Sequence, residues 1–354
     1  MKTLKKIFIK ARNAIKKITS HYFNISRSND SLDSTSTESN VIQPSFDHKD
    51  YIEIKEEVKD ISVLLTLPTT HRFAIHIDKL ILGYELSEVL DERLLNRQYV
   101  EISDNLILLP ATKRKHPTYS YEYMIYIRRE GVIEPFASIY FGNNTPYKQY
   151  IFMAIENNIF YESKLHYIYN IEHELGLYFQ FLSQIEIALD TDYDLYSHFM
   201  NNVYQNEKLV PVIFKKAYKN MEELVNSVIF FSKGSRKNIS QNISIEIRNN
   251  KKNMRLRIYD KSKEIQEQSP YKTYIQDNIQ CEQIYRAEII LKNEVLKENL
   301  KKIGTNIDYF YYNQQILSDE WLLKLYLISV NRIIRVQDPK KRKSYNLIEY
   351  LLCH

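Results

Sequence analysis

Three short segments of this chain alternate between apolar and polar residues, and they constrain its fold more than any other feature. They cover Gln184–Asp190, Arg255–Lys261 and Tyr285–Leu291. Successive side chains of a strand point to opposite faces, so each segment predicts a strand with one apolar and one charged face. We therefore expect a sheet that rests on a core with one face and presents charged groups on the other.

The middle segment combines a phenol hydroxyl with several cations. Its apolar face is Leu256 and Ile258, and its polar face carries Arg255, Arg257, Tyr259 and Lys261. Neighbouring cations favour the phenolate form of a tyrosine, whose ordinary pKa is about 10, and they also bind phosphodiester oxygens. The pattern therefore indicates a nucleophile facing phosphate. Because 29 of the 354 residues are tyrosine, an incidental Tyr on a half-solvated strand is the alternative.

The other two segments carry carboxylates on their polar faces. Glu186 and Asp190 share a face of the first strand, and Glu288 shares a face with Arg286 on the last. Carboxylate pairs of this kind bind divalent cations, or simply face solvent. Glu186 and Asp190 are about 13 Å apart along a regular strand, so one ion needs a bulge to bind both.

Composition excludes several classes of function. The chain has only six glycines and contains no GxGxxG or GxxxxGK[ST] pattern, which argues against dinucleotide and P-loop chemistry. Its two cysteines, Cys281 and Cys353, are too few for a disulfide framework or a thiolate zinc site, as expected in a reducing cytoplasm. No apolar run approaches the roughly 18 residues of a membrane span. The net charge of +5 is a mild basic excess.

The chain divides into three predicted parts within an α+β fold. Residues 1–45 combine a basic amphipathic helix with a polar linker, and the helix suits DNA, an acidic lipid surface, a partner helix or a solvated arm. Residues 70–302 form the main domain, with a central, mostly antiparallel sheet and helices packed on it. Residues 303–354 form a helical C-terminal segment, which contains an apolar helix at Trp321–Ile334.

The amino-acid sequences of the three predicted strands resemble those of a known family. In the replication initiators of rolling-circle plasmids (the Rep-trans type), and in related nickases of integrative elements, three strands read LDLAFD, IRIYxK and RVEIxLK. The counterparts here read IEIALD, LRIYDK and RAEIILK, at residues 185–190, 256–261 and 286–292. Upstream, SIYFGNN resembles the family strand RVEFNPN, and FFSKGSRKN resembles its Gly-Ser loop. The resemblance covers roughly residues 70–300.

The resemblance implies roles for individual residues. Tyr259 matches the catalytic tyrosine, which attacks a phosphodiester and leaves a 5′-phosphotyrosyl link with a free 3′-hydroxyl. The metal ligands for Mg²⁺ or Mn²⁺ would be Glu186, Asp190 and Glu288. The DNA-binding side chains would be Arg255, Arg257, Lys261 and Arg286. Two departures are Glu186 in place of an aspartate and Tyr140 in place of a glutamate.

The resemblance also implies a biological role and partners. A free 3′-hydroxyl suits priming by a polymerase, so we expect a cytoplasmic initiator that nicks plasmid or mobile-element DNA. The DNA would be single-stranded or extruded at the nick site, with a host helicase and a second copy of the chain as further partners. Two alternatives stay open: a relaxase for conjugative mobilisation, which uses the same chemistry, and a DNA-binding regulator without catalysis.

Overall fold

The computed structural model describes most of the chain from residue 71 onward. The described residues are 71–86, 92–112, 115, 116, 118–129, 131–142, 150–162, 164–205, 208–218, 228–231, 244–249, 253–338, 340 and 343–353. All of them belong to one compact unit. The predicted amphipathic helix and linker at residues 1–45 lie outside them, as does most of the segment FFSKGSRKN. No helix among the described residues has the length and apolar character needed to cross a membrane.

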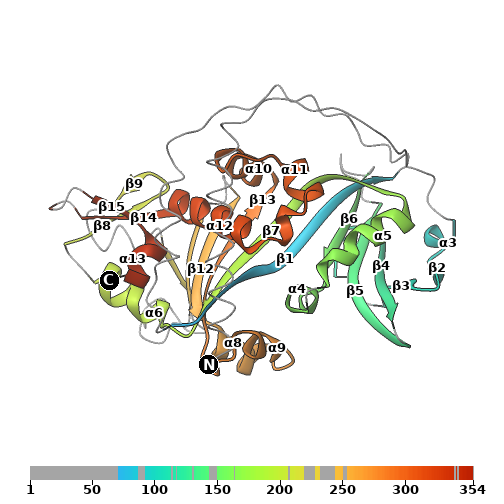
Figure 1. Ribbon diagram of the computed structural model, residues 1–354, viewed down its shortest axis with the longest axis horizontal. Helices are drawn as coiled ribbons and strands as arrows, with labels where there is room; N and C mark the ends of the chain where they lie inside the picture. The colour runs from blue at the N-terminus through green and yellow to red at the C-terminus, as the bar shows by residue number, and fades with distance from the viewer. Residues whose placement is uncertain are drawn as a thin grey trace, which may run out of the picture. The chain divides into compact units, whose positions relative to one another are not determined.

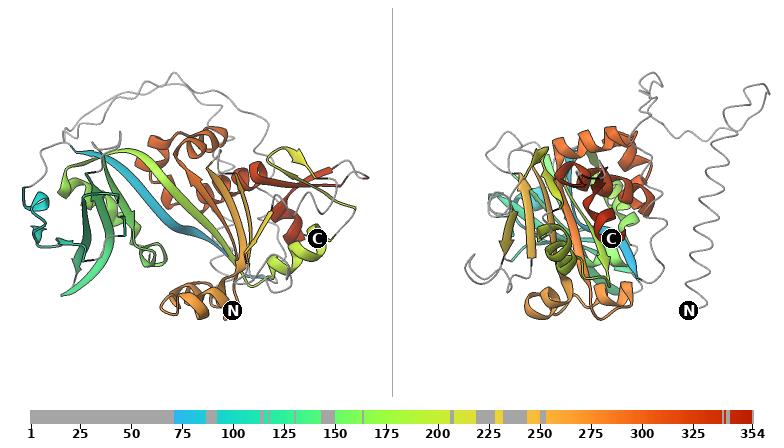
Figure 2. Two further views of the ribbon diagram at one scale, coloured as in Figure 1. Left: turned by 180° about the vertical axis from the view of Figure 1, so that it is seen from behind. Right: turned by 90° about the vertical axis from the view of Figure 1, so that its left-hand side faces the viewer.

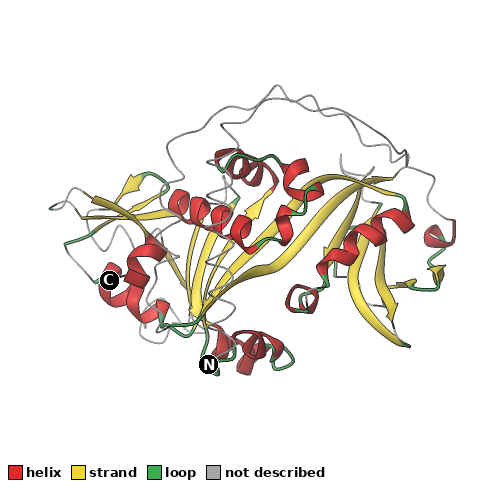
Figure 3. Ribbon diagram, in the orientation of Figure 1, coloured by secondary structure: helices red, strands yellow, loops and turns green. Residues whose placement is uncertain are grey.

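A large sheet dominates this unit (Figures 1 and 3). Its strand order is β10-β11-β12-β13-β7-β1-β6-β5-β4-β3-β2, and every pairing between neighbours is antiparallel. The strands are β1 (Phe73–Leu86), β2 (Val100–Ser103), β3 (Leu106–Pro110), β4 (Tyr121–Arg129), β5 (Val132–Phe141), β6 (Tyr150–Ile155), β7 (Leu177–Thr191), β10 (Val228–Phe231), β11 (Ser244–Asn249), β12 (Met254–Asp260) and β13 (Tyr285–Lys292). The predicted α+β fold with an antiparallel sheet is confirmed.

The three alternating segments lie in β7, β12 and β13, side by side in one half of the sheet. Leu256 and Ile258 of β12 are fully buried, as their alternation predicts. One boundary differs, because Lys261 begins a helix instead of ending the strand. Figure 2 shows the long strands β1 and β7 side by side, and these two strands join the halves of the sheet.

The apolar face of this half is covered by two helices from later in the chain. α10 (Asn293–Lys302) and α12 (Asp319–Ile333) pack against β7, β13, β12 and β1. The hydroxyl of Tyr326 in α12 donates a 3.0 Å hydrogen bond to the backbone carbonyl of Ala287 in β13. The long apolar helix predicted at Trp321–Ile334 therefore has the core of the sheet as its partner surface.

The C-terminal part contains strands as well as the predicted helices. β14 (Ile334–Asp338) follows α12 directly and pairs with β8 (Val210–Ile213) and β15 (Lys343–Asn346). Together with β9 (Lys216–Ala217) they form a second, four-stranded sheet. The last helix is α13 (Leu347–Cys353). α12 and β14 contact elements from before residue 302, namely β1 and β8.

Three short helices lie over one end of the polar face. They are α4 (Asn158–Tyr161), α8 (Lys261–Gln268) and α9 (Tyr274–Ile279). Buried isoleucines of α8, of α9 and of the position just before β13 form a small cluster with Ala74 and Tyr161: Ile265, Ile275, Ile279 and Ile284. This cluster includes Ile265 of α8, the helix that follows directly on the C-terminal end of β12. The remaining helical elements are α3 (Glu92–Leu95), η2 (Leu165–Tyr167), α5 (Ile168–Leu175), α6 (Leu195–His198), η3 (Phe199–Tyr204), α11 (Ile307–Tyr312) and η6 (Gln315–Leu317).

Candidate active site

The register of β12, β13 and β7 lines up the predicted site residues in rows. Tyr259 lies opposite Arg286, which lies opposite Asp190 on the next strand. Two residues along, Arg257 lies opposite Glu288. Alternate residues share a face, so all of these side chains project from the same side of the sheet. The fold therefore brings together residues that are up to 98 positions apart in sequence, from Asp190 to Glu288.

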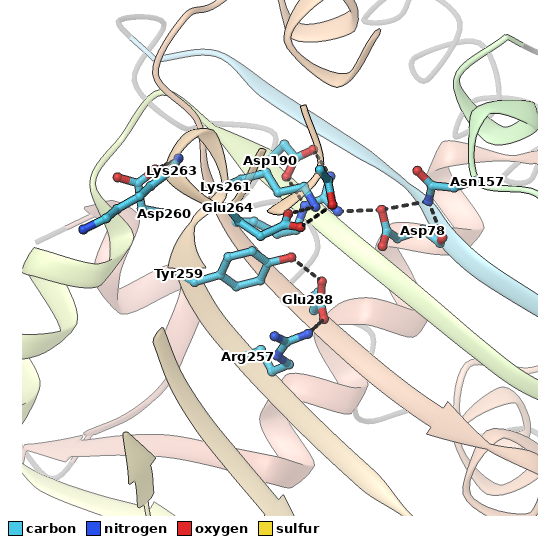
Figure 4. A network of polar contacts seen from close by, with 12 residues as sticks. Asp78, Asn157, Asp190, Arg257, Tyr259, Asp260, Lys261, Lys263, Glu264 and Glu288 are labelled. Atoms are coloured by element: carbon cyan, nitrogen blue, oxygen red, sulfur yellow. Dashed lines mark hydrogen bonds and ion pairs between the residues drawn. The ribbon is translucent and has the colours of Figure 1, made fainter. Parts of the chain in front are cut away.

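Tyr259, Glu288 and Arg257 form one continuous set of contacts (Figure 4). The hydroxyl of Tyr259 donates a 2.8 Å hydrogen bond to Oε2 of Glu288. The other carboxylate oxygen of Glu288, Oε1, accepts a 2.8 Å hydrogen bond from Nη1 of Arg257. Tyr259 is 5% exposed and Glu288 is 1% exposed. This geometry places a proton acceptor directly on the hydroxyl of the candidate nucleophile.

The protonation of Tyr259 differs from the sequence-based expectation. Burial, and then the charge of Glu288, raise the pKa of Tyr259 well above its usual value, although Arg286 and Arg257 act in the opposite direction. The cations alone predict an easily ionised phenol, but desolvation and a neighbouring carboxylate both disfavour the phenolate. The hydroxyl of Tyr259 is therefore protonated in this arrangement.

Arg286, which is itself fully buried, is the centre of a second network. Its Nε and Nη2 donate to the two carboxylate oxygens of Asp190 at 2.6 and 2.7 Å. Its Nη1 donates to Asp78 at 2.5 Å, and Nη2 also contacts the Tyr161 hydroxyl at 2.9 Å and His76 Nε2 at 3.3 Å. With no exposed surface, the guanidinium group has no side open to a ligand. A DNA contact of Arg286, as predicted, would therefore require these hydrogen bonds to break.

Lys261 is also withdrawn from the surface. Its side chain is 3% exposed and forms an ion pair with Glu264 in the first turn of α8. Burial, and then the charge of Arg286, lower the pKa of Lys261 despite the nearby carboxylates of Asp78 and Glu264. The change from strand to helix at Lys261 turns its amine inward, so the predicted DNA contact of Lys261 would require the ion pair with Glu264 to open.

Arg255 and Arg257 keep the accessibility that a DNA contact needs. Their side chains are 40% and 36% exposed. Both lie on the polar face of β12, on the side of Tyr259 away from α8. These are the two predicted DNA-binding residues that the structure leaves accessible.

The three predicted metal ligands do not fit one divalent cation as they lie here. Both oxygens of Asp190 accept hydrogen bonds from Arg286, and one also lies 3.2 Å from His76. Burial alone would raise the pKa of Asp190, but Arg286 and His76 hold it well below its usual range. The two carboxylate oxygens of Glu288 accept hydrogen bonds from Arg257 and Tyr259. Across the part of the chain that the structure describes, no group of three or more His, Cys, Asp or Glu side chains is arranged to hold a metal.

Glu186 is distant from Asp190 along β7, but it is a diagonal neighbour of Glu288 on β13. The pairing of β7 with β13 is regular from Glu186 to Asp190, so no bulge shortens the distance of about 13 Å between them. Glu186 accepts a 2.5 Å hydrogen bond from Gln184 and lies 3.9 Å from the amine of Lys79. Burial, and then the charge of Glu288, raise the pKa of Glu186 to about 7. Glu186 is therefore a group that titrates close to neutral pH.

Tyr140 lies outside this site. It is on β5, which is five strands from β12 in the sheet, or about 24 Å at 4.8 Å per strand. Its ring is 4% exposed and stacks on His116 with ring centroids 3.9 Å apart. Tyr140 is therefore part of an aromatic cluster on a different part of the sheet from Tyr259.

Several residues of the site were missed in the sequence. His76 and Asp78 lie on β1, where the register with β7 shifts between Ile77 and Lys79 and gives β1 an extra residue at Asp78. The alternation that places Phe73, Ile75 and Ile77 on one face of β1 indicates a polar partner face. The charges of Arg286, Lys261 and His76 lower the pKa of Asp78 although burial, the largest single effect, opposes them.

Two further residues had no usable signal in the sequence. Tyr161 reaches the site from α4, and its hydroxyl lies 2.7 Å from Nε2 of His76. Glu246 lies on β11, opposite Arg257, and is 3% exposed. β11 is one of many short alternating segments in this chain, so its alternation alone did not single out Glu246.

The comparisons with known proteins include a similarity to a solved structure. No family model matches the chain, and no curated protein matches it. Among solved structures, the chain is similar to the rolling-circle replication initiator protein from Geobacillus stearothermophilus, with 13% sequence identity and a TM-score of 0.39. The match covers 79% of this chain and 95% of that chain. With so little identity, the chemistry has to be inferred from the side chains themselves.

Proposed function

We propose that this chain is a replication initiator of a plasmid or mobile element that nicks single-stranded DNA with Tyr259 as the nucleophile. The observation that carries the proposal is the contact between the Tyr259 hydroxyl and Glu288, since a nucleophile with a proton acceptor within 2.8 Å is the basic unit of this chemistry. The Rep-trans pattern in the sequence supplies the reaction class.

The proposed step is a transesterification. The oxygen of Tyr259 forms a bond to phosphorus, the bond from phosphorus to the 3′-oxygen breaks, and the hydroxyl proton passes to Glu288. The released 3′-oxygen takes up a proton from solvent. The product is a 5′-phosphotyrosyl link and a free 3′-hydroxyl, which a polymerase can extend.

Arg257 has two roles in this proposal. Its hydrogen bond to Oε1 of Glu288 orients the carboxylate so that Oε2 faces the Tyr259 hydroxyl. Its half-exposed guanidinium group also lies beside the ring of Tyr259, 5.1 Å from the ring centroid. It is therefore close enough to bind the phosphate under attack and to stabilise the charge that develops on it.

The role of a metal ion stays a prediction. Mg²⁺ or Mn²⁺ would neutralise charge on the phosphate. Both carboxylate oxygens of Asp190 and of Glu288 already accept hydrogen bonds, however, and Glu186 is about 13 Å from Asp190 along β7. The step described above therefore assigns roles only to side chains of this chain. Interaction with a host helicase and assembly into a homodimer also stay predictions from the resemblance.

One observation favours a second candidate function. Tyr259 is only 5% exposed, so a phosphodiester reaches its hydroxyl only after the side chains around it move. A DNA-binding regulator without catalysis needs no such movement and would still use Arg255 and Arg257. A relaxase, by contrast, uses the same chemistry as the initiator and differs in its partners.

Formation of a covalent adduct separates a nicking enzyme from a DNA-binding regulator without catalysis. The full chain would be incubated with single-stranded oligonucleotides that tile both strands of the DNA encoding and flanking it. A protein–DNA band that survives denaturing electrophoresis, and that the Tyr259→Phe variant does not form, is the expected result. Binding of the same oligonucleotides without any adduct would favour the regulator and overturn the proposal.

A further inference from the structure

Three arginines of β11 and β12 surround one buried carboxylate beside the candidate nucleophile. Glu246 lies opposite Arg257, and Arg248 lies opposite Arg255. The N–O distances from Glu246 are 3.6 Å to Arg255, 3.8 Å to Arg248 and 3.8 Å to Arg257. At these distances the groups attract one another by charge, but they are too far apart to form hydrogen bonds.

The carboxylate at the centre of this cluster is incompletely satisfied. Glu246 is 3% exposed, and within the described residues its Oε1 has no hydrogen-bond partner, nor has Nε of Arg257. A buried charge without hydrogen bonds is costly unless other charges compensate it. Here the positive charges of the three guanidinium groups provide that compensation. Glu246 therefore attracts these groups by charge, while their N–H groups form no hydrogen bond to it.

Arg286 differs from Arg248 and Arg255 because its N–H groups are already hydrogen-bonded. It is fully buried and donates hydrogen bonds to Asp190, Asp78 and Tyr161 at 2.5–2.9 Å. An arginine in that position has to break existing bonds before it can bind a phosphate. Arg248 and Arg255 have no such bonds to break at Glu246, because their separations from it exceed hydrogen-bonding distance.

We propose that Arg248 and Arg255 bind a backbone phosphate of single-stranded DNA next to the one that Tyr259 attacks and Arg257 contacts, with Glu246 as the residue that positions them. The proposal rests on the function proposed above. Guanidinium groups bind phosphate oxygens through paired N–H bonds, and the side chains of Arg248, Arg255 and Arg257 are 42%, 40% and 36% exposed.

The spacing of the backbone positions on β12 favours a separate phosphate. Tyr259 and Arg255 are four residues apart on one face of a strand, which corresponds to about 13 Å. A phosphate held between Arg255 and Arg248 is therefore distinct from the one at the Tyr259 hydroxyl. The site extends the DNA path along the strand, away from α8 and toward the end of the hairpin between β11 and β12.

The test measures binding of a labelled single-stranded oligonucleotide over a salt series, with Tyr259→Phe as the background so that no cleavage occurs. Each phosphate contact on a single strand contributes about 0.7 to the slope of log K against log salt. We expect Arg248→Gln to reduce the slope by about that amount. The matched control is Arg128→Gln, an exposed arginine of β4 that pairs with Glu101 and should leave the slope unchanged.

The role of Glu246 is tested by combining variants. In a Glu246→Gln background the amide no longer attracts the guanidinium groups, so adding Arg248→Gln should change the slope less than it does alone. An equal change in both backgrounds would show that Glu246 does not position Arg248. Thermal melting of each variant verifies that the fold is retained.

The outcomes separate this proposal from the proposed function. A reduced slope in Arg248→Gln, with no covalent adduct formed by the unmodified chain, would support the phosphate site and overturn nicking. Adduct formation with an unchanged slope in Arg248→Gln would overturn the phosphate site and leave nicking in place. Equal losses in Arg248→Gln and Arg128→Gln would also overturn it, since both would then report only overall charge.

Discussion

Tyr259 and Glu288 lie diagonally across two neighbouring strands, not opposite each other. The residue opposite Tyr259 is Arg286, and the tyrosine hydroxyl reaches Glu288 two residues further along β13. Diagonal neighbours are within reach of a long aromatic side chain. Because Asp190 and Asp78 already hold Arg286, the partner of the hydroxyl is a carboxylate and not a cation. This relationship changes Tyr259 from a predicted phenolate into a protonated hydroxyl beside a base.

Replacement of Tyr259 by phenylalanine should abolish the covalent adduct while leaving oligonucleotide binding intact. The variant loses the hydroxyl and leaves one oxygen of Glu288 without its donor, at a cost of about 1–3 kcal/mol in the free energy of unfolding. Tyr285→Phe is the control, because this partly exposed tyrosine lies next to the site on β13. Adduct formation by Tyr259→Phe would remove Tyr259 from the reaction.

Replacement of Glu288 by glutamine should slow adduct formation by about 10²- to 10⁴-fold, the usual contribution of a general base. The amide keeps the shape of the side chain but does not accept the tyrosine proton. Adduct yield over time on a denaturing gel measures the rate. Glu298→Gln is a suitable control, since Glu298 is an exposed residue of α10 that pairs with Arg332. Equal rates for the Glu288 variant and the unmodified chain would contradict the assignment of Glu288 as the base.

Replacement of Asp190 by asparagine should destabilise the fold more than it affects any metal. The variant leaves Arg286 buried with a weaker partner, and disrupting a buried ion pair costs about 3–5 kcal/mol. The loss, measured by denaturant unfolding, should be equal in Mg²⁺ and in chelator. Asp192→Asn is the control, because Asp192 pairs with the exposed His71 and its loss should cost under about 1 kcal/mol. Stabilisation of the unmodified chain by Mg²⁺, but not of Asp190→Asn, would instead support a metal role for Asp190.

Stability should depend on pH through Glu186. Its pKa is raised to about 7 in the folded chain, so folding favours the protonated form. That contribution is fully present below the ordinary glutamate pKa of about 4.3 and is lost as pH rises through 7. Glu186→Gln mimics the protonated side chain and should melt above the unmodified chain at pH 8, with the difference shrinking toward pH 5. A difference in melting temperature that does not change with pH would contradict the raised pKa.

Deletion of residues 1–45 should leave the covalent adduct intact. The sequence separates this segment from every candidate catalytic residue by a polar linker, and Tyr259, Glu288 and Arg257 all lie within the compact unit that follows. The measurement is adduct formation beside duplex binding over a salt series. A shallower salt dependence after deletion would identify the basic segment as an accessory DNA contact. Loss of the adduct in a folded truncation would show that the predicted domain boundary is wrong.

The sequence by itself determined the strands of the site and their faces. Alternation with a period of two is a local property, so β7, β12 and β13, and the shared face of Tyr259 and Arg257, could be predicted without any tertiary information. The α+β class followed from the same segments and the helices between them. The helical assignment of residues 303–354 was incomplete, because β14 forms its sheet with β8, about 120 residues earlier in the chain.

Only the tertiary structure decided which charged side chains are available to a ligand. Arg255 and Arg286 both lie on a polar strand face, yet Arg255 stays accessible while Arg286 is fully buried between Asp190 and Asp78. The position of Asp78 depends on a register shift between β1 and β7, and the inward turn of Lys261 depends on where β12 ends. Burial and charge pairing are set by groups distant in sequence, and they determine both the protonation of Tyr259 and the cations that remain free to bind phosphate.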